Sequence, residues 1–247
     1  MRTGQDYRGR MLQAALNGGV RRDQHGGVPT SADALAADFR ACLEVGVSRF
    51  HVHPRDGIGH ESLEWADVSA VLDVVPPSAV MGVSTAEWIE PDSSRRRSAI
   101  RSWTGRLASA SVNLGEPGSL QLMRLLVDKG IGIEAGIWTV GDVDVLARSG
   151  LADRLLRVLV EPFAARVDDA LSQVAELHDA LDAAGVGAPR LQHGDGDATW
   201  LLLEDALRRG IDTRIGLEDT LRLPDGRLAE GNLELVLAAQ ALGAGGD

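Results

Sequence analysis

The sequence has 247 residues, a length that one α/β barrel commonly uses, so a single large core is expected. Hydrophobic residues make up 44% and charged residues 25% of the chain, which is typical of a folded globular protein and excludes a disordered one. The formal net charge of −11 argues against a broad nucleic-acid-binding surface, because such surfaces need clustered lysine and arginine.

In chain order, short β-rich apolar runs alternate with longer segments of helical periodicity, the pattern of βα units and a parallel sheet. Strands are predicted at Met11–Leu16, Ser48–His53, Ala79–Ser84, Ser109–Asn113, Gly132–Ile137, Leu156–Val160, Arg190–His193 and Thr213–Leu217. Helices are predicted at Ser31–Val45, Glu64–Val74, Ser93–Thr104, Ser119–Asp128, Val140–Arg148, Val167–Ala184, Thr199–Arg208 and Asn232–Ala241.

Runs such as Arg157–Val160 are continuously apolar, which indicates strands that are covered on both faces. Eight βα units close a barrel, so the fold class predicted is α/β, a single (β/α)₈ TIM barrel spanning residues 1–247. The alternative is an open doubly wound sheet. It is disfavoured because Asn17-Gly18-Gly19, after the first strand, does not form the GxGxxG turn of that fold.

Three smaller features complete this description. Cys42 is the only cysteine, which excludes intramolecular disulfides and cysteine-based zinc clusters and fits a reducing cytoplasm. No run approaches the ~18 apolar residues of a membrane span, and the first ten residues lack an apolar signal segment, so we expect a cytoplasmic protein. The basic run Arg95–Arg97 is expected to form a solvated helix face.

The active site of a TIM barrel lies at the carboxyl ends of its strands, so the residues that close each strand are the candidates for chemistry. In this chain they are unusually polar. They are Asn17, His51, His53, Ser84, Thr85, Asn113, Glu134, Trp138, Glu161, His193, Glu218 and Asp219.

His51-Val52-His53 is the most informative of these segments, because alternate residues of a strand point to the same side and two imidazoles can share one metal. Glu218 ends the eighth strand and supplies a third ligand at the same rim. We therefore predict one divalent metal, zinc by preference, held by His51, His53 and Glu218, with an open position. Hydrogen-bonded rim histidines without a metal are the alternative.

The remaining candidates have both functional and structural interpretations. Arg214, if it faces inward, needs a carboxylate partner such as Asp219 or Glu134, and otherwise reaches the lower rim. Asp219 can be a general base or orient a ligand. Short polar residues at strand ends bind substrate oxygens or cap the next helix, and this applies to Ser84, Thr85 and Asn113. Glu134 and Glu161 can contact cations or cap helices.

Together these segments resemble the β-keto acid cleavage enzymes, whose founding activity is 3-keto-5-aminohexanoate cleavage. The resemblance covers nearly the whole chain, from ALNGG at Ala15–Gly19 to about Gly231. Its most specific blocks are HVHPRD and RIGLED, and its supporting blocks are VPTSADALA, GVSTAEWI, SVNLGEPG and GIEAGIWT.

The resemblance implies a zinc-containing transferase that condenses a β-keto acid with acetyl-CoA and releases acetoacetate and a new acyl-CoA. It implies that the metal ligands are His51, His53 and Glu218 and that the catalytic pair is Arg214 and Asp219. Ser84, Thr85 and Asn113 would bind the substrate carboxylate, and Glu134 is kept as a further substrate-binding candidate. A homo-oligomer, either a dimer or a tetramer, is also implied.

The chain departs from the founding enzyme at three places. No acid follows the first strand, where the founding enzyme recognises the substrate's amino group; Arg21 and Arg22 stand nearby, so a neutral or weakly acidic keto acid is expected. The family's STGG is here Ser84-Thr85-Ala86-Glu87, a less permissive loop. The chain is also short for the family after the eighth strand, where fewer residues remain for contacts with acetyl-CoA.

Two other functions are compatible with parts of this pattern. Amidohydrolase-type enzymes carry HxH on the first strand and further histidines on the fifth and sixth, whereas here HxH is on the second, and Glu134 and Glu161 close the fifth and sixth. A non-catalytic metal- or metabolite-binding barrel is the other alternative. Retention of all three predicted metal ligands together with Arg214 and Asp219 argues against it.

Overall fold

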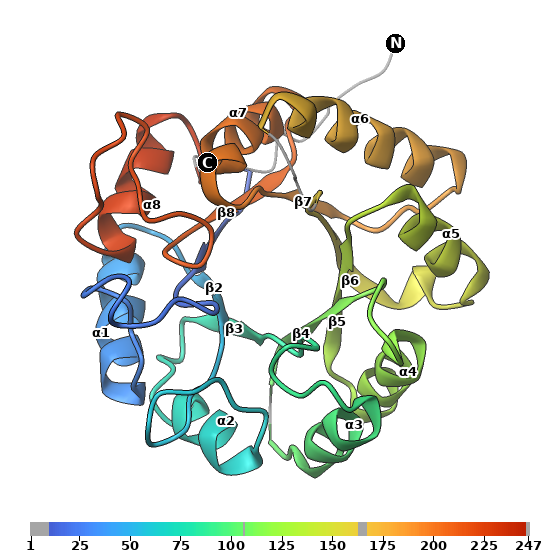
Figure 1. Cartoon of the computed structure of the whole chain (residues 1–247), viewed down its shortest axis with the longest axis horizontal. Coiled ribbons are helices and arrows are strands. Elements are labelled where there is room, and N and C mark those ends of the chain that lie inside the picture. Colours follow the sequence, from blue (N-terminus) through green and yellow to red (C-terminus); the bar gives the residue numbers. More distant parts are fainter. Residues whose placement is uncertain (1–9, 106, 163–166, 246–247) are drawn as a thin grey trace.

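The computed structural model describes residues 10–105, 107–162 and 167–245 and confirms the predicted barrel. Eight parallel strands close on themselves in chain order, and the helices form a ring around them (Figure 1). The strands are β1 Leu12–Ala15, β2 Arg49–Val52, β3 Val80–Val83, β4 Ser109–Asn113, β5 Gly132–Ile137, β6 Leu155–Val160, β7 Arg190–Gln192 and β8 Asp212–Ile215.

A helix follows each strand at the place expected from the sequence, and two short 3₁₀ turns interrupt the connections. The helices are α1 Ala32–Glu44, α2 Trp65–Leu72, α3 Ser93–Ser102, α4 Ser119–Lys129, α5 Val140–Arg148, α6 Val167–Ala183, α7 Thr199–Arg209 and α8 Asn232–Ala241. The turns are η1 Ala152–Arg154 and η2 Gly196–Ala198. Across the residues that the structure describes, no helix combines the length and apolar character that a membrane crossing needs.

Local sequence explains where the helices begin and end. The side chains of Ser31, Asp92 and Thr139 accept hydrogen bonds from the first-turn amides of α1, α3 and α5. Gly130 and Gly210 end α4 and α7 in the left-handed conformation, which favours glycine because a Cβ would be strained there. These signals are short-range, so the predicted helix boundaries agree with the observed ones to within two residues.

The eighth strand is shorter at its carboxyl end than predicted, because the chain turns at Gly216. A Cβ at Gly216 would lie 1.9 Å from the backbone oxygen of Ala15 in β1, closer than any real contact. We therefore expect Gly216→Ala to lower the free energy of unfolding by about 1–3 kcal/mol or more, since β1 and β8 must move apart. Urea denaturation checks this. Gly57→Ala, where a Cβ would meet nothing within 4 Å, should change stability little.

The expectation of a solvated face for Arg95–Arg97 is wrong for its middle residue. Arg96 is 1% exposed, lies 3.4 Å from Glu116 and donates a hydrogen bond to the backbone oxygen of Pro117. Arg96 differs from its two neighbours because α3 directs its side chain toward the loop after β4. Arg96 thus fixes Glu116, which contacts the rim of the barrel.

The lower part of the barrel interior holds a polar network. Glu134 of β5 lies 3.1 Å from the Nε of Arg157 on β6 and accepts a hydrogen bond from Gln13 of β1. Arg157 also lies 3.7 Å from Asp212. Gln13, Glu134 and Arg157 border a cavity of about 210 Å³ on the side of the barrel away from the carboxyl ends of the strands. Burial raises the pKa of Glu134, and Arg157 offsets this in part, so the carboxyl group belongs to this lower layer.

Candidate active site

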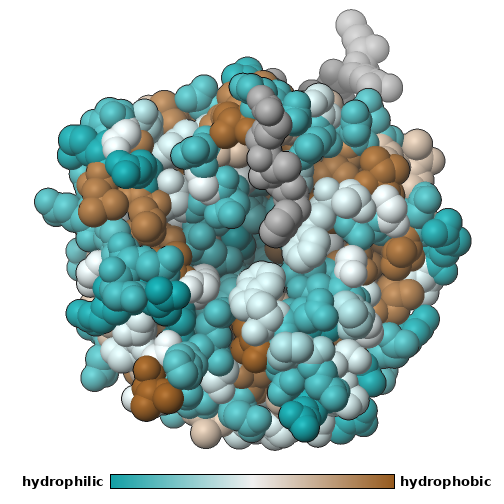
Figure 2. Space-filling view, in the orientation of Figure 1, coloured by the Kyte–Doolittle hydropathy of each residue, from teal (hydrophilic) through white to brown (hydrophobic). Residues whose placement is uncertain are grey.

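A pocket of about 280 Å³ opens at the carboxyl ends of the strands. Figure 2 shows it as a hollow at the centre of the barrel face, with hydrophilic side chains around it. Its described lining comes from β2, β4, β6 and β8 and from the loops that follow the strands other than β4, and it includes His51, His53, Asn113, Arg214 and Glu218. This is the place that the fold class predicts for an active site.

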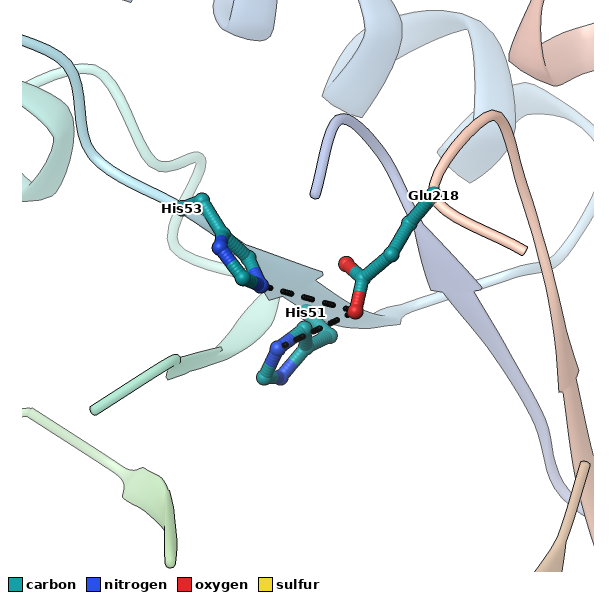
Figure 3. Close-up of side chains that lie close together, drawn as sticks. All are labelled: His51, His53 and Glu218. Carbon is teal, nitrogen blue, oxygen red and sulfur yellow. Dashed lines mark ion pairs between the residues drawn. The ribbon is translucent and has the colours of Figure 1, made fainter. Parts of the chain in front are cut away.

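His51, His53 and Glu218 point toward one another across this pocket (Figure 3). The Nε2 atoms of His51 and His53 lie 3.7 and 3.5 Å from the Oε1 of Glu218, and one ligand atom from each residue falls within 4.8 Å of the others. Bonds of about 2.0–2.1 Å to a tetrahedral metal place ligand atoms at similar separations. His51 lies in β2 and His53 directly follows its last residue, so both rings point to one side. Glu218 reaches them because β8 closes the barrel against β1 and the chain turns at Gly216.

A second carboxylate fixes the ring of His53. Its Nδ1 lies 2.5 Å from the Oε1 of Glu61, which also accepts a hydrogen bond from the indole of Trp88. The Trp88 ring stacks on His53 with a centroid distance of 6.3 Å. A histidine whose Nδ1–H is held by a carboxylate presents the lone pair of Nε2, which is the usual arrangement around a protein metal ligand.

The two histidines have opposite electrostatic environments. Burial lowers the pKa of His51 to about 3, so its imidazole is neutral. Burial acts in the same direction on His53, but the carboxylates of Glu218 and Glu61 outweigh it and raise the pKa of His53 to about 9. The carboxylates around His53 therefore favour a positive charge between His53 and Glu218.

The described residues fit a divalent metal on two further grounds. The Oε2 of Glu218, the residue that both histidines face, is buried and has no hydrogen-bond partner, although buried polar atoms are normally paired. The donor set of two imidazoles and one carboxylate is also one that catalytic zinc sites use. The structure thus brings together the three residues that the sequence predicted as ligands.

Arg214 faces inward and is paired with carboxylates. Its Nε and one terminal nitrogen donate to Asp219 at 3.0 and 2.7 Å, and it donates to Glu218 at 2.9 Å. Burial would lower the pKa of Arg214, but Asp219 and Glu218 outweigh it and raise that pKa, so the guanidinium stays charged. The partner is Asp219, as one of the two sequence alternatives proposed, whereas Glu134 pairs with Arg157.

Asp219 lies behind Arg214 and His193 and is 2% exposed. Its Oδ1 takes the bonds from Arg214, while its Oδ2 is buried without a hydrogen-bond partner. Burial raises the pKa of Asp219 to about 6, because the loss of hydration outweighs the attraction of Arg214. A carboxyl group with these properties can exchange protons near neutral pH.

The three predicted binders of the substrate carboxylate occupy different positions. Ser84 and Asn113 line the pocket. Thr85 is 1% exposed and donates its hydroxyl to the backbone oxygen of Ser111, so it braces β3 against β4. Glu134 is also outside the pocket lining. Glu134 is the third residue of β5 and lies one layer below the rim. The residues that line the pocket on this side of the barrel are Trp138 and Glu161.

Some functional neighbours were missed by the sequence reasoning. Glu61 lies in a loop, and an antiparallel bridge between Arg55 and Glu61 folds it back onto His53. Glu161 and His193 were noted separately, but the structure places their side chains 2.7 Å apart. The adjacency of β6 and β7 in a closed barrel is the signal that could have paired them.

Comparison with known proteins identifies the family. A family model described as beta-keto acid cleavage enzyme matches residues 10–245. No curated protein matches the chain. Among solved structures, apo ObcA is 18% identical with a TM-score of 0.69, covering 87% of this chain and 61% of its own. A ternary complex of ObcA with a C4-CoA adduct and oxalate is 19% identical, with a TM-score of 0.68 and coverages of 87% and 62%.

A dihydropteroate synthase from Xanthomonas albilineans is 16% identical with a TM-score of 0.55, covering 96% of this chain and 92% of its own. At these identities the solved structures show a shared fold. The chain spans about three fifths of the length of ObcA. Because the family model matches almost its entire length, this chain belongs to the beta-keto acid cleavage enzyme family.

Proposed function

We propose that this chain is a metal-dependent transferase that exchanges acyl groups between a β-keto acid and acetyl-CoA, releasing acetoacetate and a new acyl-CoA. The observation that carries the proposal is the meeting of His51, His53 and Glu218 in one pocket that Arg214 also lines, with Asp219 bonded to Arg214. Family membership supports the reaction class, and the CoA adduct bound by ObcA supports a CoA thioester as the second substrate.

The proposed metal ligands are His51, His53 and Glu218, with zinc as the preferred ion. When bound, such an ion supplies a Lewis acid that polarises the keto carbonyl. Glu61 holds the Nδ1 of His53 and so keeps its Nε2 directed into the site.

The protein's own contribution to the chemistry is proton transfer at C2 of the keto acid. Asp219 is the proposed base, with Oδ2 as the free acceptor and Arg214 holding Oδ1. C2 forms a bond to the acetyl carbon as the acetyl C–S bond of acetyl-CoA breaks and frees the CoA thiolate. The thiolate then attacks C3 of the original keto acid, and the C2–C3 bond breaks to leave the keto acyl group on CoA. Asp219 then returns its proton to C2 of acetoacetate, so the exchange is balanced.

The position of the substrate carboxylate follows from the pocket lining. Ser84 directly follows β3, the neighbour of β2, and its hydroxyl can donate. We propose that it binds this carboxylate together with the charge of Arg214. Thr85 acts through the β3–β4 contact rather than by touching substrate. We also propose that the protein forms a homo-oligomer, as the family resemblance implies, and that it works in the cytoplasm.

The test is acetoacetate release from purified protein. Zinc-loaded protein given acetyl-CoA and a panel of β-keto acids should form acetoacetate only when both substrates are present, and chelation should abolish the activity until zinc is restored. Formation of acetoacetate that is indifferent to chelation would contradict the metal dependence. Failure with every β-keto acid at full metal occupancy would favour a non-catalytic barrel.

Loss of Glu61 should weaken metal binding without removing a ligand. We expect Glu61→Ala to lower zinc affinity by about 10–100-fold, because the Nδ1 of His53 loses its partner. Competition with a chromophoric chelator measures this. Glu64→Ala, an exposed acid of the same loop whose side chain caps nothing, is the matched control and should leave the affinity unchanged.

A further inference from the structure

Two of the proposed metal ligands lie just beyond the strands that carry them. β2 ends one residue before His53, and β8 ends three residues before Glu218. Among the described residues, the last backbone bond between β1 and β2 runs from the N–H of Leu16 to the oxygen of His51, at 3.0 Å. The backbone of His53 therefore lies past the hydrogen-bond ladder of the barrel.

The side chain of Asn17 continues the hydrogen bonding beyond that ladder. Its Oδ1 accepts from the N–H of His53 at 2.8 Å, and its Nδ2 donates to the backbone oxygens of His53 and Pro29 at 2.9 and 3.1 Å. Because an amide has one accepting and one donating end, these partners fix its orientation. Asn17 is fully buried. One side chain thus bonds both polar groups of the His53 backbone.

A second buried asparagine lies on the other side of β1. Asn232, the first residue of α8, accepts at Oδ1 from the N–H of Leu217 at 2.8 Å and donates from Nδ2 to the oxygen of Leu16 at 2.8 Å. Asp38 of α1 accepts from the same Nδ2 at 2.6 Å. Leu217 directly precedes Glu218, so this amide holds the chain from which Glu218 projects.

Together the two amides replace one rung of the parallel ladder. After the bond from Leu16 to His51, a regular parallel pair would next bond the N–H of His53 to the oxygen of Leu16. Here Asn17 takes the N–H, and Asn232 takes the oxygen. The relative position of these strand ends at the pocket is therefore set by side chains rather than by the backbone ladder.

The end of β1 is the common support of both ligand-bearing segments. β1 lies between β2 and β8 in the closed barrel and carries none of the three proposed ligands. Asn17 ties its end to His53, and Asn232 ties it to the segment before Glu218. A Cβ at Gly18 would lie 2.5 Å from the Cγ of Glu218, so the chain after Asn17 also packs closely against that side chain.

We propose that Asn17 and Asn232 are positioning residues of the metal site, which hold His53 and Glu218 at the separation that one divalent ion needs. That separation is 3.5 Å between the Nε2 of His53 and the Oε1 of Glu218. Neither asparagine is among the described residues that line the pocket, so each acts through the backbone it bonds. The inference rests on the metal ligands of the proposed function and adds the groups that space them.

Replacement of each asparagine by leucine, which has a similar size and no hydrogen-bonding group, tests this role. We expect Asn17→Leu and Asn232→Leu each to raise the zinc Kd of the folded protein by about tenfold or more, as loss of an outer partner of a metal ligand commonly does. Competition with a chromophoric chelator measures the Kd. Thermal unfolding of the metal-free variants shows that the protein is folded at the temperature of the titration.

The matched control removes a buried amide from a strand that carries no proposed ligand. Gln192 of β7 is fully buried and donates to the backbone oxygen of Leu202 at 2.8 Å and to Asp205 at 3.0 Å. Gln192→Met should lower the unfolding temperature as the asparagine variants do, yet change the zinc Kd less than about twofold. An unchanged Kd in both asparagine variants, or an equal rise in Gln192→Met, would overturn the inference.

Asn17→Asp keeps the test decisive if the leucine variants do not fold. It preserves the size of the side chain and the oxygen that accepts from His53, and it replaces the two donated bonds by contacts between oxygens. An added carboxylate near the site would by charge alone favour zinc, so a higher Kd in this variant reports the displaced ligand. An equal or lower Kd would contradict the positioning role.

Zinc binding and turnover, measured on the same parent protein, separate this inference from the proposed reaction. Parent protein that binds zinc but turns over no β-keto acid, with a raised Kd in the asparagine variants, would sink the reaction and keep the inference. Turnover by the parent, with an unchanged Kd in those variants, would sink only the inference. A folded parent that binds no zinc would overturn both.

Discussion

Asp219→Asn should lower kcat/KM for β-keto acid cleavage by about 10²–10⁴-fold, the usual contribution of a positioned general base. The change removes the proton-accepting Oδ2 but keeps an oxygen that can still accept from Arg214, so the buried pair is weakened rather than abolished. Steady-state assays with acetyl-CoA and a keto acid measure the loss. Zinc content should stay near that of the parent, because Asp219 is not among the proposed ligands.

The control for folding is the thermal transition of Asp219→Asn together with its zinc content. Asp219→Glu retains the charge beside Arg214 but moves the carboxylate, and it should also lose most activity while remaining folded. Parental activity in a folded, zinc-loaded Asp219→Asn variant would show that another group takes the proton. His193, which lies 3.7 Å from Asp219 and lines the pocket, would then be the nearest candidate.

His51→Ala should abolish both stoichiometric zinc and turnover. His51 supplies one of three proposed protein ligands, and its loss should weaken zinc binding beyond the 10–100-fold that removal of an outer partner costs. Elemental analysis of protein purified in zinc-containing buffer gives the metal content. The neutral state of His51, whose pKa is lowered to about 3, means that no proton has to leave this ligand first.

His178→Gln is the matched control for loss of a buried histidine. His178 is buried on α6 and bonds the side chain of Gln192, away from the pocket. This variant should keep about one zinc per chain. Zinc retained in His51→Ala, or lost equally in His178→Gln, would contradict the ligand assignment.

The positions of the strand ends could be predicted because strands and helices alternate regularly along the chain of a barrel. Once eight apolar runs are assigned, the closed parallel order brings every carboxyl end to one rim, and His51, His53 and Glu218 meet there without knowledge of the loops. Short-range caps such as Ser31 and Thr139 fix the helices in the same way. Periodicity and local chemistry together are enough for the fold and for the cluster of His51, His53 and Glu218 that could hold a metal.

The features that sequence reasoning missed depend on loop geometry and on depth within a strand. Glu61 reaches His53 through a bridge of its loop, and Arg96 turns inward to hold Glu116; neither contact has a periodic signal. Glu134 was grouped with the strand ends, yet it lies one layer deeper because β5 continues to Ile137. The orientation of the Asn113 amide follows from its bond to Glu116, so it could not be read from residue type.

The most direct test of the proposed exchange follows carbon from acetyl-CoA into acetoacetate. Zinc-loaded protein is given acetyl-CoA labelled with ¹³C in both acetyl carbons and an unlabelled β-keto acid, and the products are examined by carbon NMR. The proposed bond changes predict both labels at C3 and C4 of acetoacetate and an unlabelled new acyl-CoA. Label at C1 and C2, or acetoacetate without label, would contradict the account.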